Sequence, residues 1–167
     1  MTVLTVLHYP DIRLKTKAEP VTDITPAIKT LVEDMFETMY HDNGIGLAAT
    51  QVNVHLRVIV MDIAQDNKQK YHFINPEILE AHGTEVSEEG CLSVPGVYDK
   101  VSRSARIKVK ALNIDNQEFI LEAEGLLAVC IQHEIDHING KLFIDHLSLL
   151  KRERALKKME KLKYRTL

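Results

Sequence analysis

The segment HEIDH, residues 133–137, contains two histidines four positions apart and a glutamate directly after the first. Side chains four residues apart share one face of an α-helix, so the imidazoles of His133 and His137 can bind a single metal ion. Glu134 follows His133 by about 100° of helical rotation, which places its carboxylate beside that ion. From there it can hold a water molecule and accept its proton. The segment therefore predicts a metal site that activates water.

An ordinary helix with two histidines and two acids on a solvated face would contain the same five letters. However, the residues that precede the motif, 126–132 (LLAVCIQ), are strongly apolar and favour a buried helix. Because buried imidazoles without polar partners are costly, this context favours metal binding.

A catalytic metal site of this kind needs a third protein ligand and one open position. Position 143, where a histidine would extend the pattern to H-E-x-x-H-x-x-G-x-x-H, holds Phe143, although Gly140 fits that pattern. Two later glutamates, Glu153 and Glu160, lie in a strongly basic segment. The remaining candidates are the two cysteines.

Cys91 lies in residues 88–96 (EEGCLSVPG), where Gly90 permits close backbone approach and residues 95–96 predict a turn. A thiol at such a bend, beside a cation, ionises to a strong metal ligand. The alternative, Cys130, follows Leu126 and Val129 on an apolar helical stripe, so core packing explains it. The predicted ligand set is Cys91, His133 and His137.

The elements that must position these residues can be predicted from periodicity. Apolar residues recur at helical spacing over residues 26–41, with Thr25 available as a cap and Pro26 at the first helical position. A second helix is expected over residues 125–138, and a third from about residue 148. Branched and aromatic residues predict strands at 56–62, 71–75, 105–112 and 118–124.

Together these elements predict an α+β fold. Antiparallel sheets pack around a central helix that carries the H-E-x-x-H motif, with an N-terminal and a C-terminal helix outside them. Residues 105–112 show the alternation of a half-solvated antiparallel strand.

Composition is that of a water-soluble globular chain, with 45% hydrophobic and 27% charged residues in a length of 167. We expect a single domain over residues 1–167. The sequence has neither an apolar run of about 18 residues nor the pattern of a signal peptide. We therefore expect a cytoplasmic protein that has no membrane partner, and a disulfide between the two cysteines is disfavoured in that reducing compartment.

Three separated segments, residues 44–51 (GIGLAATQ), 89–93 (EGCLS) and 132–137 (QHEIDH), resemble the signature motifs of peptide deformylases, in the right order. The resemblance extends over nearly the whole chain, from residues 6–14 (VLHYPDIRL) to the basic C-terminal helix. It is closest to the compact bacterial type with a helical C-terminus. Thr50 stands where many members have proline.

The resemblance implies the reaction and the metal. Peptide deformylases remove the N-formyl group from the starting methionine of new polypeptides and release formate. The usual ion is Fe²⁺, one per chain, with Zn²⁺, Ni²⁺ or Co²⁺ as substitutes. Spacing alone leaves the metal open, because a Cys-His-His site also suits zinc.

The resemblance also assigns roles to individual residues. The side-chain N–H of Gln51 and the backbone N–H of Leu92 would stabilise the negative charge on the formyl oxygen, and Glu134 would return its proton to the leaving amine. The peptide would lie along Gly46 and Gly90 through backbone hydrogen bonds. The methionine side chain would fill a pocket lined by Ile45, Leu126, Val129 and Cys130, although core packing explains each of these four equally well.

The C-terminal helix and tail, residues 148–167, are strongly basic. Residues 151–165 contain eight Lys or Arg and two Glu, in a chain whose net charge is −3. Such a segment could dock on the ribosome, where the substrates emerge, through salt-dependent attraction that reads no nucleic-acid sequence. A solvated helix that packs one apolar side on the domain is the alternative. We expect a monomer.

Two other functions fit part of the pattern. A zinc endopeptidase would use the same H-E-x-x-H segment but needs a long open cleft. A structural zinc module on the ribosome would need four protein ligands. Only three convincing ligands are found, and Glu134 would then have no role.

Overall fold

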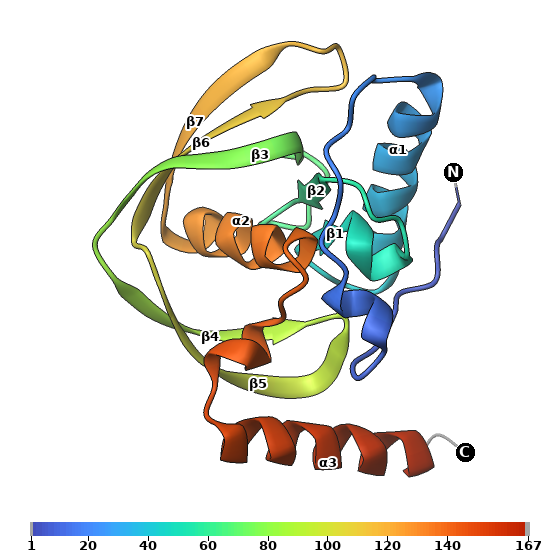
Figure 1. The fold of residues 1–167 in the computed structure, drawn as a ribbon, viewed down its shortest axis with the longest axis vertical. Coiled ribbons are helices and arrows are strands. Elements are labelled where there is room, and N and C mark those ends of the chain that lie inside the picture. Colours follow the sequence, from blue (N-terminus) through green and yellow to red (C-terminus); the bar gives the residue numbers. More distant parts are fainter. Residues whose placement is uncertain (1, 166–167) are drawn as a thin grey trace.

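The computed structural model describes residues 2–165. Its three α-helices match the predicted positions, and three short 3₁₀-helices accompany them (Figure 1). The bounds of the α-helices are α1 Pro26–His41, α2 Gly125–Ile138 and α3 Leu149–Arg165, and those of the 3₁₀-helices are η1 Ile12–Lys15, η2 Ala49–Val52 and η3 Phe143–His146.

Within residues 2–165, seven strands form two antiparallel sheets. The larger has the strand order β1-β2-β3-β6-β7, and the smaller is the hairpin β4-β5. The bounds are β1 Gly46–Ala48, β2 Val58–Met61, β3 Tyr71–His82, β4 Glu85–Cys91, β5 Val94–Arg103, β6 Arg106–Leu112 and β7 Glu118–Glu124. The α+β prediction, with antiparallel sheets around the helix that carries H-E-x-x-H, is confirmed.

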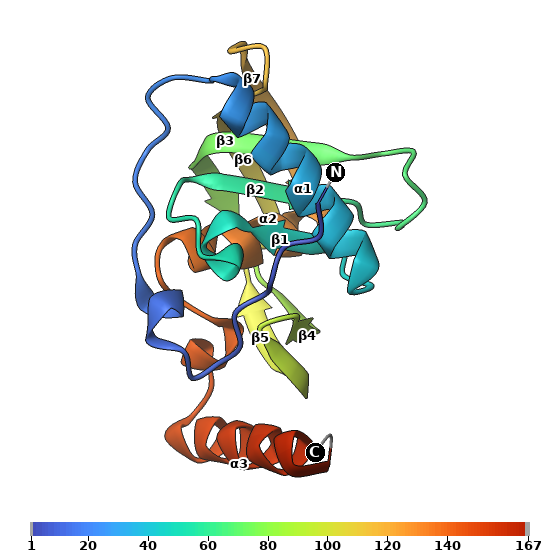
Figure 2. The same cartoon turned by 90° about the vertical axis from the view of Figure 1, so that its right-hand side faces the viewer.

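Helix α2 lies between the five-stranded sheet and the hairpin (Figure 1), and α1 covers the other face of the sheet (Figure 2). Strand β2 is buried on both faces as a result. Ile59 and Met61 pack in the same apolar cluster as α2, whereas Val58 and Val60 pack in the cluster that contains α1. This explains why its sequence is a continuous apolar run and not an alternating one.

The alternation predicted in β6 is confirmed. Ile107, Val109 and Ala111 are buried in the cluster shared with α2. Lys108 and Lys110 point to the other face, where each lies within 4 Å of glutamates on both neighbouring strands.

One local prediction is wrong, and another is confirmed only in part. The turn expected at residues 95–96 lies instead at residues 92–93, between β4 and β5. Pro95 and Gly96 belong to β5, where the register with β4 shifts and Gly96 has φ of 78°. Proline is tolerated there because both strands of a two-stranded sheet are edges. Thr25 does precede α1, but its side chain makes no capping bond.

The hairpin has an apolar cluster of its own. Val94, Val97 and Val101 pack there with residues of η3 and with Ala155 of α3. None of the described helices is long and apolar enough to cross a membrane.

Candidate metal centre and active site

The three predicted metal ligands converge at one point between the hairpin and α2. Cys91 is the last residue of β4, and both histidines come from α2. Cys91 Sγ lies 3.3 Å from His137 Nε2, which lies 3.1 Å from His133 Nε2, and all three donor atoms are within 4.8 Å of one another. A tetrahedral ion with such ligands separates them by roughly 3.3–3.6 Å, so the donor set fits one metal ion.

His133 is oriented by a buried carboxylate. Its Nδ1–H donates to Glu89 Oε1 over 2.8 Å, which leaves Nε2 free to bind a metal. Arg103 in turn donates to both oxygens of Glu89. Burial alone would raise the pKa of Glu89, but these hydrogen bonds lower it to about 2. Glu89 is therefore an ionised acceptor at neutral pH.

His137 lies deeper, with 1% of its surface exposed. Among the described residues its Nδ1 has no hydrogen-bond partner, and its Nε2 faces the other two donor atoms. Burial lowers the pKa of His137 well below its ordinary value, so the imidazole is neutral. Neutral imidazole is the form that binds metal ions.

Glu134 lies beside these ligands and is also buried, with 3% exposure. Its Oε1 is 3.8 Å from His137 Nε2 and has no hydrogen-bond partner among the described residues. Burial raises the pKa of Glu134 to about 7. A carboxyl group with such a pKa can both accept and donate a proton near neutral pH.

Gln51, in η2, lies across the site from α2. Its side-chain oxygen accepts from the Ala48 N–H at 2.9 Å, which fixes the orientation of the amide. Its Nε2 donates to Ser93 Oγ at 3.0 Å and approaches Cys91 Sγ at 3.5 Å. Leu92 occupies the turn that directly follows Cys91. Both predicted donors to the formyl oxygen are thus next to the metal ligands.

A cavity of about 480 Å³ opens onto this cluster. The predicted site residues other than His137 all line it: Ile45, Gly46, Gln51, Gly90, Cys91, Leu92, Leu126, Val129, Cys130, His133 and Glu134. Burial raises the pKa of the Cys130 thiol, so it is a neutral, apolar part of the wall.

Sequence reasoning missed four residues of the site. Glu89 and Ser93 lie in the EGCLS motif, residues 89–93. Their position beside Cys91 could have indicated that they belong to the site. Tyr98, which is 66% exposed, lines the cavity and covers Gly90. Arg103 gave no local signal, because its partners Glu89 and Asp136 are 14 and 33 residues away.

A Cys-His-His cluster beside a buried carboxyl group, at the end of a cavity, is typical of metal-dependent hydrolases. Comparison with known proteins agrees. The family model described as polypeptide deformylase matches residues 3–153. The chain belongs to the polypeptide deformylase family.

Individual relatives are similar over almost their full length. A peptide deformylase from Chromobacterium violaceum is 55% identical over 161 residues, which cover 96% of each chain. The crystal structure of a Legionella pneumophila peptide deformylase superposes on this chain with a TM-score of 0.96, and the two sequences are 49% identical. The match covers 99% of this chain and 98% of the Legionella chain. An Ehrlichia chaffeensis peptide deformylase in complex with actinonin has a TM-score of 0.93 and 43% identity, covering 96% and 98%.

The resemblance stated from the three motifs is therefore confirmed. The chain is a metal-dependent enzyme that removes the N-formyl group from the N-terminus of newly made polypeptides. This function replaces the two alternatives, a zinc endopeptidase and a structural zinc module.

Proposed function

We propose that Cys91, His133 and His137 hold one divalent metal ion, Fe²⁺ in the cell, and that Zn²⁺, Ni²⁺ or Co²⁺ can substitute. The observation that carries this assignment is the convergence of the three donor atoms within 4.8 Å. A single thiolate with two imidazoles suits Fe²⁺ and the three substitutes. When bound, the ion supplies positive charge that polarises the formyl group and makes water more acidic.

Glu134 acts as the general base and then as the general acid. It accepts a proton from the attacking water as that water adds to the formyl carbon. It then delivers the proton to the amine nitrogen as the carbon–nitrogen bond breaks, so formate and a free N-terminus leave. A pKa of about 7 suits both steps.

Gln51 and Leu92 stabilise the oxygen that gains negative charge. The side-chain amide of Gln51, fixed by Ala48 and Ser93, offers one N–H, and the backbone of Leu92 offers another. Because the Gln51 amide is held before substrate binds, it needs little reorganisation during the reaction.

The cavity recognises methionine and the peptide backbone. Ile45, Leu126, Val129 and Cys130 form the apolar wall for the methionine side chain. Gly46 and Gly90 let the peptide approach closely enough for backbone hydrogen bonds. Such contacts accept many sequences after the methionine.

Metal analysis tests the ligand assignment. Protein loaded anaerobically with Fe²⁺ should contain one ion per chain, and Cys91→Ala should lose most of it. Cys130→Ala is the matched control and should keep the ion. Full metal content in Cys91→Ala would overturn the assignment.

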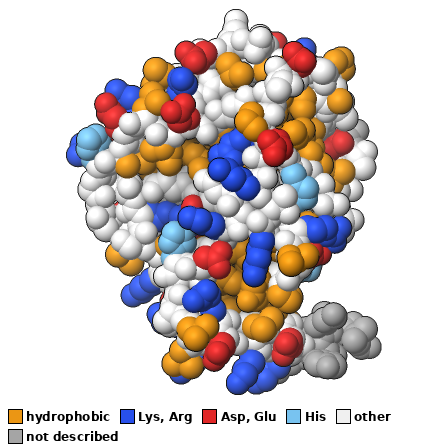
Figure 3. Space-filling view, viewed as in Figure 1, with side chains coloured by type: hydrophobic (Ala, Val, Ile, Leu, Met, Phe, Trp, Pro, Cys, Tyr) orange, Lys and Arg blue, Asp and Glu red, His pale blue; other side chains and the backbone are white. Residues whose placement is uncertain are grey.

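We further propose that residues 1–167 act as one catalytic domain in the cytoplasm, as a monomer, and that α3 docks on the ribosome. Lys157, Lys158 and Lys161 of α3 are exposed, whereas Ala155 packs on the domain. In Figure 3 the lower edge, where α3 lies, carries blue basic side chains among red acidic and orange apolar ones. Residues 166–167 and the side chains of 163–165 lie outside the described part of the chain.

Ribosome cosedimentation tests the docking. Replacing Lys157, Lys158 and Lys161 with Glu should weaken binding to the ribosome and should make that binding less dependent on salt concentration. The same change at exposed Lys29 and Lys68 serves as the control and should have little effect. Unchanged binding of the α3 variant would contradict the proposal.

A further inference from the structure

The H-E-x-x-H segment contains a second carboxylate that the hydrolytic steps do not use. Asp136 lies between the two histidines in sequence, and its Oδ2 accepts hydrogen bonds from two side chains. Arg103 Nη1 donates over 2.6 Å and His146 Nε2 over 2.8 Å. Arg103 ends β5 and His146 ends η3, so three elements meet at this carboxylate.

Arg103 joins Asp136 to the carboxylate that orients His133. Its Nε and Nη2 each donate to Glu89 over 2.8 Å, and its Nη1 donates to Asp136. The arginine side chain is 4% exposed, and those of Glu89 and Asp136 are 5% and 20% exposed. A buried guanidinium between two carboxylates is costly to disturb, because removal of one partner leaves buried charge uncompensated. We call Glu89, Arg103 and Asp136 the arginine bridge.

The arginine bridge spans the two elements that carry the metal ligands. On the hairpin, Glu89 is two residues from Cys91; on α2, Asp136 lies between His133 and His137. The hairpin's apolar cluster has no described member from α2. The arginine bridge therefore ties Cys91 to the histidines by a route that does not pass through a metal.

We propose that Asp136, held by His146, is a positioning residue for the metal centre. Through Arg103 it fixes the hairpin against α2, and through Glu89 it sets the ring of His133. This inference rests on the proposed metal centre at Cys91, His133 and His137. Partners that orient metal ligands from outside typically change metal affinity or activity by about 10–100-fold when they are removed.

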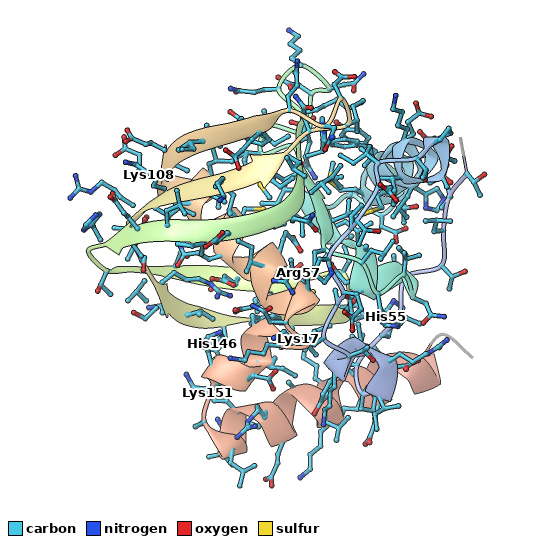
Figure 4. The ribbon with its side chains drawn as sticks, turned by 45° about the horizontal axis from the view of Figure 1, so that its top comes forward. Lys17, His55, Arg57, Lys108, His146 and Lys151 are labelled. Atoms are coloured by element: carbon cyan, nitrogen blue, oxygen red, sulfur yellow. The ribbon has the colours of Figure 1, made fainter. Side chains whose placement is uncertain are left out.

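His146 completes this arrangement from the surface. A carboxylate can only accept, so the His146 Nε2–H is the donor in its bond with Asp136. The histidine side chain is 39% exposed and comes from η3, beneath α2 (Figure 4). With this bond in place, Asp136 is held toward Arg103 and not free to turn into solvent.

Asp136→Asn tests the proposal with Co²⁺ as the probe. The change keeps the size of the side chain but removes its charge, so the guanidinium loses one of two carboxylates. We expect Co²⁺ to leave for a chelator at least ten times faster than from the unaltered protein, and the visible absorption spectrum of the bound ion to change. Both readouts are independent of hydrolysis.

Asp99→Asn is the matched control. Asp99 also lies on β5 and forms an ion pair, with Lys151 of α3 at 3.2 Å, but it is not part of the arginine bridge. This variant should keep the spectrum and the dissociation rate of the unaltered protein. His146→Gln keeps an N–H donor, so its Co²⁺ dissociation rate should also be close to that of the unaltered protein. His146→Ala should release Co²⁺ several times faster than the unaltered protein.

The outcomes separate the possible failures. An unchanged spectrum and dissociation rate in Asp136→Asn would overturn the positioning role, even with a lower melting temperature. If Asp136→Asn does not fold, the two His146 variants test the proposal instead, because the exposed His146 side chain can be replaced without unfolding the chain. Equal Co²⁺ dissociation rates in His146→Ala and His146→Gln would overturn the proposal. If the unaltered protein does not bind Co²⁺, the metal centre itself is wrong and the inference fails with it.

Discussion

At Gly46 the backbone passes so close to α2 that an added side chain would have to displace the side chain of Glu134 or Cys130. A Cβ atom there would collide with Glu134 Oε2 and lie 2.9 Å from Cys130 Sγ. The restriction is one of space, because the backbone of Gly46 is not in the left-handed region. The glycine therefore leaves room for the carboxylate that we propose as the general base.

Gly46→Ala should lower kcat/KM for deformylation by about 10²-fold, because an added methyl group displaces Glu134 from its working position. Formate release by the metal-loaded variant measures the effect. Gly125→Ala is a useful comparison, since a Cβ there meets nothing within 4 Å; it should cost some stability at φ of 62° but little activity. Full activity in Gly46→Ala would show that the site can relax around the methyl group.

How far the sequence predicts the site depends on whether a residue's role is local. Four-residue helical spacing was enough to pair His133 with His137 and to place Glu134 beside them. Arg103 could not be found that way, because its function arises from partners on a neighbouring strand and on α2. Recognition of the family motifs, and not periodicity, supplied the roles of Gln51 and Leu92.

At the scale of elements, helices were easier to predict than the hairpin. Helices α1 and α2 bury continuous apolar stripes, so their periodicity and end signals gave the observed bounds. Strand β4 reads as polar because its inward-facing Glu89 is buried against Arg103 and His133 and not in an apolar core. The buried charge of Glu89 thus removed part of the alternation by which strands are predicted.

The loop between β2 and β3 is held by a buried carboxylate. Asp62 accepts hydrogen bonds from the Tyr40 hydroxyl at 2.6 Å, from the Asn67 N–H at 2.9 Å and from the Gln65 N–H at 3.1 Å. Burial alone would raise the pKa of Asp62, but these bonds lower it below its ordinary value. Ionised Asp62 therefore ties α1 to this loop.

Acid unfolding should reveal this contribution. Because the pKa of Asp62 is lower in the folded chain than in the unfolded chain, its stabilisation is fully present above the ordinary value of about 3.9. It is lost as pH falls through the folded value. At pH 7 the free energy of unfolding of Asp62→Asn should be lower than that of the unaltered chain. Between pH 5 and 3 it should fall by less than that of the unaltered chain, and urea unfolding measures both differences. Exposed Asp66→Asn should follow the unaltered chain, and an identical profile for Asp62→Asn would contradict this account.

At the scale of the whole molecule, the site exists only where distant parts of the chain meet. Gln51 comes from η2, Cys91 from the hairpin, and His133 and His137 from α2. Periodicity predicts each element but not their convergence, whereas the order of the three motifs did imply it. A metal ion at this junction would join the hairpin layer to the central helix.

Metal removal should therefore lower the stability of the whole fold. Free ion at 1,000 times its dissociation constant stabilises the folded chain by about 4 kcal/mol if the unfolded chain does not bind it. Thermal unfolding before and after treatment with a chelator measures the difference. Cys91→Ala should show little change on chelation, and an unaltered protein with equal melting temperatures in both states would argue against a bound ion at this junction.

Formate release from formyl-Met-Ala-Ser by the Fe²⁺-loaded chain and by its Glu134→Gln variant, with the metal content of both, tests the central claim most directly. We expect the same metal content in both proteins and rapid release by the unaltered chain. Release by the variant should be slower by about 10²–10⁴-fold, the usual contribution of a general acid–base group. A fully loaded Glu134→Gln that releases formate at the unaltered rate would contradict the role of Glu134 at this metal centre.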